Sequence, residues 1–171
     1  MNHDSKEANN LVIKDTPEDF ETWINKDFIS PELRVQLRKS DILLIPTEGF
    51  RDLTYPVFPV KTEELFNYLR KNSPEDINID ICIEDKDYRE VALHSDLVIL
   101  SSFIVSSVAL PILINLISTY LSQKLLKPEK TNVKVSITVV NKDGESKNLS
   151  YEGSVDHFKE VANKSKDLWE G

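Results

Sequence analysis

The chain has 171 residues, of which 40% are apolar and 29% charged, so it is long enough for one folded domain with a core. Its formal net charge of −8 argues against a general basic surface, and we expect no nucleic-acid binding. The single cysteine, Cys82, excludes an internal disulfide framework and fits a reducing compartment. Because the first ten residues lack a basic start followed by an apolar stretch, we expect no secretory leader and a cytoplasmic location.

Two helix starts are predicted in the first third of the chain. Thr16 followed by Pro17 has the features of an N-cap and a first helical residue. Ser30 followed by Pro31 repeats the same pattern. Each start is followed by apolar residues at helical spacing, so we expect two short helices.

A strand, a helix and a second strand are expected next. Residues 42–45 are an apolar run of buried-strand length, and residues 46–60 contain three prolines and form an extended loop. Residues 61–71 have helical periodicity. In residues 77–84 isoleucines alternate with other side chains, which predicts a central strand with one buried face. This order predicts a βαβ unit with parallel strands.

The last third predicts a hairpin and a helix. Valine and isoleucine alternate with polar residues at 133–139, residues 141–144 end in the Asp-Gly pair of many hairpin turns, and residues 147–151 form the return strand. A two-stranded hairpin is marginal alone, so the following helix must pack on it. The apolar side of that helix is predicted to consist of Val155, Phe158, Val161, Ala162, Leu168 and Trp169.

The longest feature is a run of 27 residues without charge, residues 97–123. As one helix it would measure about 40 Å, more than the hydrocarbon thickness of a bilayer. Pro111 in its middle argues against a simple span. Three hypotheses stay open: a membrane contact, one helix or two shorter elements buried in the core, and a contact with a partner or a second copy. The predicted interaction residues of this run are Phe103, Ile104, Leu110 and Ile114.

Together these elements predict an α/β or α+β fold. Residues 1–14 are expected to be a disordered tail and residues 15–96 an acidic βαβ-like part. Residues 97–126 are expected to be a long apolar helical segment, followed by a β-hairpin packed by a helix in residues 127–171. We expect the acidic part and the hairpin part to form one domain.

The pattern from His94 to Trp169 resembles a known family. It consists of a chargeless segment, a basic exit, a strand of alternating valines, a hairpin with a glycine turn and a final amphipathic helix. This order is similar to that of the bacterial effector-associated constant component modules. The resemblance covers less than half of the chain and lies in the order of elements. It implies an adaptor encoded beside effectors in bacterial conflict and defence systems, without catalytic residues.

We expect no catalytic residue, metal or cofactor. Cys82, Asp80 and His94 contain the residue types of a nucleophile site, but no helix start lies beside Cys82 to lower its pKa, so a structural thiol is the better interpretation. The acids between residues 84 and 90 lack the spacing of a calcium loop and are expected to be a solvated face. The three histidines lack metal-ligand spacing.

The loop after residues 42–45 is the candidate ligand site. Open α/β sheets bind ligands beyond the carboxyl ends of parallel strands. Thr47, Glu48, Arg51 and Asp52 lie in that position and could contact a small polar ligand. The alternative is an ordinary connection between two elements.

These observations predict a non-catalytic adaptor or regulatory protein that docks an effector in a bacterial conflict or defence system. Its partner would be another protein or a second copy of the chain, and association with the inner membrane is one version of this hypothesis. One alternative is a small ligand-sensing or enzymatic domain that uses residues 47–60. Another is a soluble structural subunit that oligomerises through residues 97–123.

Overall fold

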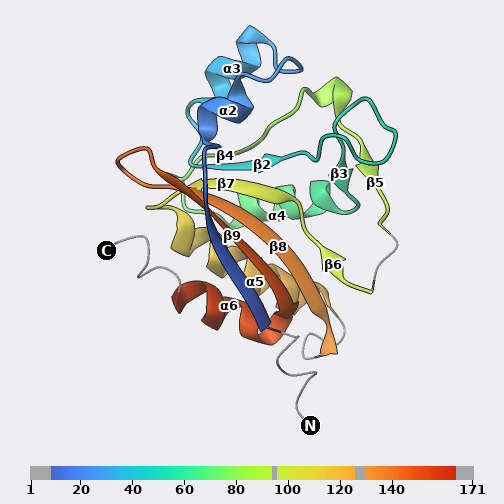
Figure 1. Ribbon diagram of the computed structural model, residues 1–171, viewed down its shortest axis with the longest axis vertical. Coiled ribbons are helices and arrows are strands. Elements are labelled where there is room, and N and C mark those ends of the chain that lie inside the picture. Colours follow the sequence, from blue (N-terminus) through green and yellow to red (C-terminus); the bar gives the residue numbers. More distant parts are fainter. Residues whose placement is uncertain (1–8, 94–95, 126–129, 165–171) are drawn as a thin grey trace.

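The protein is described from a computed structural model that covers residues 9–93, 96–125 and 130–164. Within these residues the fold is mixed α/β, with a seven-stranded sheet in the order β1-β9-β8-β7-β2-β4 and β6 paired to β8 (Figure 1). β3 (Phe58–Pro59) and β5 (Glu90–Val91) form a separate two-stranded sheet. The strands of the large sheet are β1 (Asn9–Thr16), β2 (Ile42–Ile45), β4 (Ile79–Ile81), β6 (Val98–Ile99), β7 (Ser102–Ser106), β8 (Asn132–Val140) and β9 (Ser146–Ser154).

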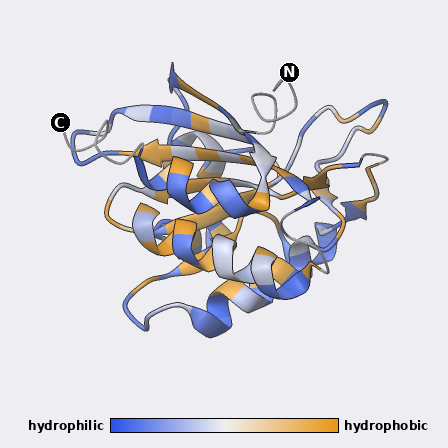
Figure 2. Cartoon of the chain, turned by 90° about the horizontal axis from the view of Figure 1, so that it is seen from below, coloured by the Kyte–Doolittle hydropathy of each residue, from blue (hydrophilic) through white to orange (hydrophobic). Residues whose placement is uncertain are grey.

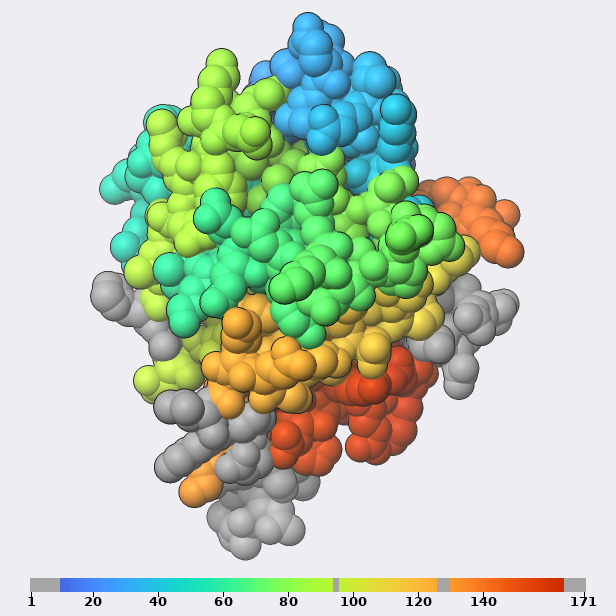
Figure 3. Space-filling view, turned by 180° about the vertical axis from the view of Figure 1, so that it is seen from behind, coloured from blue at the N-terminus to red at the C-terminus, as the bar shows by residue number. Residues whose placement is uncertain are grey.

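The helices divide between the two faces of the sheet. The long helices α4, α5 and α6 cover one face and lie next to one another in Figure 3. The short helices α2 and α3 cover the other face over β2 and β7. Figure 2 shows hydrophobic and hydrophilic residues along the helices, as expected where one side of a helix is buried. The helices are α2 (Phe20–Ile24), α3 (Pro31–Leu37), α4 (Thr62–Asn72), α5 (Leu110–Lys124) and α6 (Val155–Lys164), and a short 3₁₀ helix is η1 (Asp85–Asp87).

The large sheet contains two parallel strand pairs that are each connected through a helix. β2 and β4 are parallel and connected through α4, which confirms the predicted βαβ unit. β7 and β8 are parallel and connected through α5. β2 and β7 run antiparallel, so they join the two units into one mixed sheet.

The uncharged run, residues 97–123, is not one helix. It forms β6, β7 and then α5, with Pro111 in the first turn of α5, where its missing N–H costs nothing. Phe103 packs in the core beneath the long helices, and its neighbour Ile104 packs on the opposite face beneath α2 and α3. Because both faces of β7 are buried, the run has no period-two alternation. Among the described residues, no helix is both long and apolar enough to cross a membrane.

The first strand includes residues 9–14 of the expected tail. Residues 9–16 form β1, which pairs antiparallel with β9 over its whole length. Since Thr16 ends this strand, it does not cap the first helix. Asp19 is the N-cap instead, and its carboxylate and the side chain of Thr22 form a capping box. The second predicted cap is confirmed, because Ser30 Oγ accepts a hydrogen bond from the Leu33 N–H.

The isoleucine strand and the hairpin follow their predicted patterns with different limits. Residues 79–81 form β4 at the edge of the sheet, not at its centre. The side chains of Ile79, Ile81 and Ile83 are buried beneath the long helices, whereas Ile77 is half-buried. The predicted hairpin is β8 and β9, which pair antiparallel. In α6 the predicted Val155, Phe158 and Ala162 are buried, Val161 is half-buried, and Leu168 and Trp169 lie outside the described residues.

Candidate functional site

A β-bulge separates β6 from β7 although both strands pair with β8. Ile99 lies opposite Lys134 and Phe103 lies opposite Ile137, so four steps along one strand match three along the other. The extra residue lies at Leu100–Ser101. Ser101 is buried, and its hydroxyl lies 3.4 Å from the carbonyl oxygen of Ile45 and 3.2 Å from that of Ser102. Bulges often lie beside functional sites, because they change the direction of a strand edge.

A hollow of about 250 Å³ lies beside this bulge, and we name it the β6 hollow. One wall is residues 97–101 and the opposite wall is residues 59–62, between β3 and the start of α4. The end of α5 closes a third side with Tyr120, Leu121 and Lys124. The walls therefore come from three segments that are far apart in the sequence.

The walls of the β6 hollow are mainly apolar and partly accessible. Residues 97–100 are all half-buried apolar residues. Val60 in the opposite wall is 51% exposed, among the most exposed large hydrophobic side chains of the described residues. Apolar side chains that stay half-exposed around a concavity are typical of a binding site.

Polar groups form part of the rim. The Tyr120 hydroxyl donates a hydrogen bond of 2.7 Å to Glu64 Oε2, and Lys124 Nζ lies 3.9 Å from Glu64 Oε1. Burial, followed by the bond to Glu64 and its charge, raises the pKa of Tyr120. The hydroxyl therefore keeps its proton at neutral pH and acts as a donor to the carboxylate.

A strained residue, Lys61, begins the wall at α4. Its φ of 73° places it in the left-handed region, which costs a non-glycine residue roughly 1–2 kcal/mol. The carboxylate of Glu90 accepts hydrogen bonds of 2.9 Å from the N–H groups of Lys61 and Glu63, and another from the Tyr88 hydroxyl. Burial alone would raise the pKa of Glu90, but these bonds outweigh it and lower the pKa. An ionised Glu90 thus holds the start of α4 in place.

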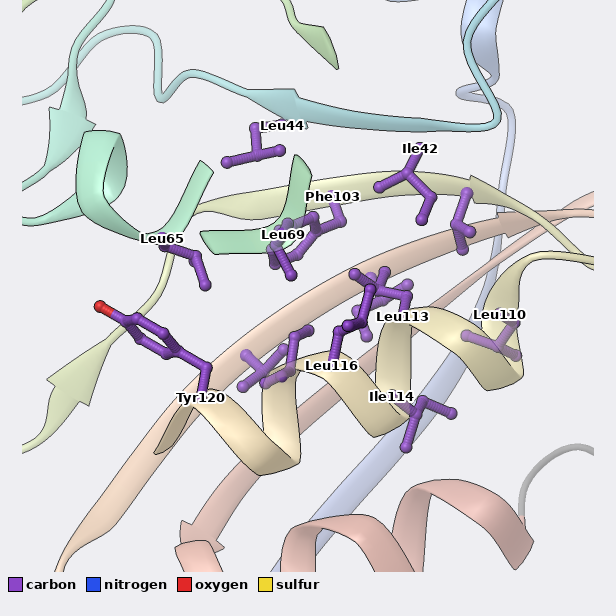
Figure 4. Close-up of a cluster of buried hydrophobic side chains, with 14 of the residues drawn as sticks. Ile42, Leu44, Leu65, Leu69, Phe103, Leu110, Leu113, Ile114, Leu116 and Tyr120 are labelled. Atoms are coloured by element: carbon purple, nitrogen blue, oxygen red, sulfur yellow. The ribbon is translucent and has the colours of Figure 1, made fainter. Parts of the chain in front are cut away.

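The predicted interaction residues lie elsewhere, in the core. Phe103, Ile104 and Ile114 are 0% exposed and Leu110 is 1% exposed. Figure 4 shows Phe103, Leu110 and Ile114 among the side chains that fill the space around α5. A contact between these four residues and a partner would require the core to open.

The predicted ligand residues lie where expected, at the carboxyl end of β2, but they form no common site. The side chains of Thr47, Glu48, Arg51 and Asp52 are exposed. Thr47 pairs through its backbone with Val57, and Glu48 forms an ion pair of 2.8 Å with Lys26. Arg51 has a φ of 53° and its guanidinium lies over Phe50.

A second hollow, of about 410 Å³, lies at the same end of β2 and β4 and is named the carboxyl-end hollow. The Arg89 guanidinium in its wall lies 4.0 Å from the centre of the Tyr55 ring, a cation–π contact. Asp27 and Asp87 also line it, but within the described residues neither forms an ion pair with Arg89. Sequence reasoning found this loop but missed Tyr55 and Arg89, because nothing local connects them.

Cys82 is a buried thiol. Its burial, followed by the negative charge of Asp80, raises its pKa to about 12, so the reactive thiolate is scarce at neutral pH. The Sγ atom lies 3.5 Å from the carbonyl oxygen of Trp23. The proposed third member of a nucleophile site, His94, lies outside the described residues.

The acids of residues 84–90 are not simply a solvated face. Glu84 accepts a hydrogen bond of 2.7 Å from the Ser30 N–H at the start of α3, and hydrogen bonding to Ser30 lowers its pKa. Glu90 does the same at the start of α4. Two of these acids therefore stabilise helix starts, and the described residues contain no group of side chains that could hold a metal ion.

One close polar pair was not anticipated. Ser154 Oγ lies 2.7 Å from His157 Nδ1 and accepts the His157 N–H at 3.4 Å. Ser154 directly precedes α6, so the pair has the geometry of a helix cap three residues apart. The spacing Ser-x-x-His is the signal that could have predicted it.

Comparisons with known protein families, with curated proteins and with solved structures find no match for this chain.

Proposed function

We propose that the chain is a non-catalytic adaptor that binds a segment of a partner protein in the β6 hollow. The observation that carries this proposal is the wall of half-exposed apolar side chains at residues 97–100, next to a bulge and a strained helix start. Bulges and strained backbones cluster at functional sites, and so do accessible apolar concavities. The β6 hollow combines a bulge, a strained backbone and an accessible apolar concavity, and a site for a protein segment accounts for all three.

The sequence pattern supports the same proposal and suggests a partner. The chain from His94 to Trp169 resembles adaptor modules encoded beside effectors in bacterial conflict systems. On this basis we propose that the segment bound in the β6 hollow belongs to such an effector, and that binding occurs in the cytoplasm.

Site-specific photo-crosslinking in cells that naturally encode the chain tests this proposal. p-Benzoylphenylalanine replaces Val60, in the wall of the hollow, or Val35 on α3 as a control of similar exposure, 51% against 59%. We expect a discrete crosslinked product of higher mass from position 60 and none of the same mass from position 35. Equal products from both positions, or none from position 60, would reject the proposal.

A second candidate function is small-ligand sensing at the carboxyl-end hollow. The observation that favours it is the Arg89 guanidinium, which the Tyr55 ring holds in place in a hollow that also contains two carboxylates. Such separate charges complement a zwitterion. Amide spectra recorded during titration with L-leucine or with inorganic phosphate test this function. The amino acid should shift the amides of Thr54, Tyr55 and residues 87–89, and should shift them less in Arg89→Lys. No shift, or shifts with phosphate alone, would contradict this function.

A further inference from the structure

The hydrogen bonds of β6 give its two edges different roles. The Leu100 N–H donates to the carbonyl oxygen of Lys134, and the parallel register places Val98 opposite Val133 and Ile99 opposite Lys134. In this register the N–H and C=O groups of Val98 point toward β8. Those of the intervening residue, Ile99, point in the opposite direction.

In the part of the chain that the structure describes, no strand pairs with β6 on that opposite side. The pairing of β2 with β7 ends at Ile45 opposite Ser102, and β6 pairs only with β8 among the described strands. Five consecutive residues, 97–101, line the β6 hollow. Because successive side chains of a strand point to opposite faces, a hollow lined by consecutive residues lies along the strand edge. The N–H and C=O of Ile99, which have no protein partner in the described part of the chain, therefore face the hollow.

We propose that the β6 hollow binds an extended segment of another protein as an added strand. In this complex the Ile99 N–H donates to a carbonyl oxygen of the segment, and the Ile99 C=O accepts a hydrogen bond from an N–H of the segment. This inference rests on the proposed adaptor function and specifies how the partner is bound. An unpaired strand edge selects an extended backbone, because no other common ligand supplies a donor and an acceptor at strand spacing.

The size of the hollow agrees with this occupant. Its volume of about 250 Å³ is below the range of roughly 300–1,000 Å³ that is usual for small-molecule sites. It takes one or two apolar side chains of a strand and leaves the rest of the segment outside. Leu100 and Leu125 in its wall make an aliphatic side chain the best complement.

The charged residues of the lining indicate that the bound segment carries a carboxylate. Lys61, Lys124 and Glu64 are the charged residues of the wall. Lys124 lies 3.9 Å from Glu64, whereas Lys61 forms no ion pair within the described residues, so the lining has an excess positive charge. A C-terminal carboxylate or an acidic side chain beside the apolar residue complements Lys61.

Three small probes separate this occupant from others. They are acetyl-Ala-Leu-Val with a free carboxylate, the same tripeptide with a C-terminal amide, and sodium octanoate, which has an apolar tail and a carboxylate but no backbone amides. Each is titrated to about 10 mM into the ¹⁵N-labelled full chain, a range suited to weak complexes. We expect the peptide acid to shift the amides of residues 97–101, the peptide amide to bind several-fold more weakly, and octanoate to leave these amides unchanged.

The matched variants are Ile99→Pro and Ile99→Val. Proline removes the Ile99 N–H and leaves the bonds to β8 intact, as is tolerated at a strand edge. Valine retains both the N–H and a branched apolar side chain. We expect Ile99→Val to bind the peptide acid like the wild type and Ile99→Pro to bind it up to about tenfold more weakly, since one backbone hydrogen bond to the peptide is lost. Unchanged melting temperatures and amide spectra verify that both variants fold.

Lys61→Asn is the second variant, because asparagine accepts the left-handed conformation and removes the charge. This variant should bind the peptide acid more weakly than the wild type does, and it should bind the peptide amide with unchanged affinity. The strand-addition inference is overturned if octanoate shifts residues 97–101 as strongly as the peptide acid, if no probe shifts them, or if Ile99→Pro binds normally. The adaptor function is tested separately, by crosslinking from position 60 in the Ile99→Pro variant. If the crosslinked product persists there, the partner still binds in the hollow, and only binding as an added strand is rejected.

Discussion

The sharpest test of the fold is the replacement of Ile114 by alanine. Ile114 is 0% exposed in α5, and Figure 4 shows its side chain on α5 within the buried cluster. Truncating a fully buried isoleucine costs about 2–5 kcal/mol through lost transfer energy and a residual cavity. The higher helix propensity of alanine returns at most about 0.5 kcal/mol. We therefore expect a net loss of about 3 kcal/mol, a large share of the 5–15 kcal/mol that is usual for a domain.

The adjacent Asn115 provides the matched control. Its side chain is exposed and accepts a hydrogen bond of 2.9 Å from Lys159 Nζ. Asn115→Ala loses this exposed bond but gains helix propensity, so its stability should stay within about 0.5 kcal/mol of the wild type. In urea unfolding, Ile114→Ala should lower the midpoint by about 1.5 M with an unchanged slope near 2 kcal/mol/M. A loss below about 1 kcal/mol, or an equal loss in both variants, would refute the burial of α5 in the core.

Further substitutions test individual interactions. Ser30→Ala removes the N-cap of α3 and should cost about 1 kcal/mol in thermal unfolding, whereas Ser30→Asp should cost much less. Native Cys82, with a pKa raised to about 12, should resist iodoacetamide at pH 8 and react after unfolding, as followed by mass spectrometry; rapid native alkylation would contradict its burial. Glu90→Gln tests the lowered pKa of Glu90: the stability that the carboxylate contributes is present above its ordinary value of 4.5 and is lost as pH falls through the lower folded pKa. The difference between wild type and Glu90→Gln in the free energy of unfolding should thus shrink below about pH 4.5, and a constant difference would exclude the ionised cap.

Short-range patterns predicted the elements that depend on their neighbours in sequence. The alternation in residues 133–139 and the Asp-Gly turn predicted β8 and β9, because both strands of a hairpin lie close together in the chain. The cap at Ser30 and the β2–α4–β4 unit were also predicted correctly. The loop after β2 was placed at the carboxyl end of a parallel strand, where the carboxyl-end hollow lies.

Tertiary structure decided the rest, because the deciding contacts join distant residues. β1 was expected to be part of a tail, since its partner β9 begins 130 residues after β1 ends and no local pattern announces it. The uncharged run was ambiguous because a strand buried on both faces and a buried helix have the same composition. Only the position of β7 between β2 and β8 made residues 102–106 a strand.

By itself, the sequence determined a mixed α/β chain with a βαβ unit and a hairpin, because periodicity and turn chemistry act over a few residues. The β6 hollow was determined only in three dimensions. Its walls are residues 59–62, residues 97–101 and the end of α5, which meet only in the folded chain; the left-handed Lys61 lies in the first wall and the bulge at Leu100–Ser101 in the second. A strand edge is free only when no other strand pairs with it. Which strands become neighbours in a sheet depends on the packing of the whole chain, so a local sequence pattern cannot reveal a free edge.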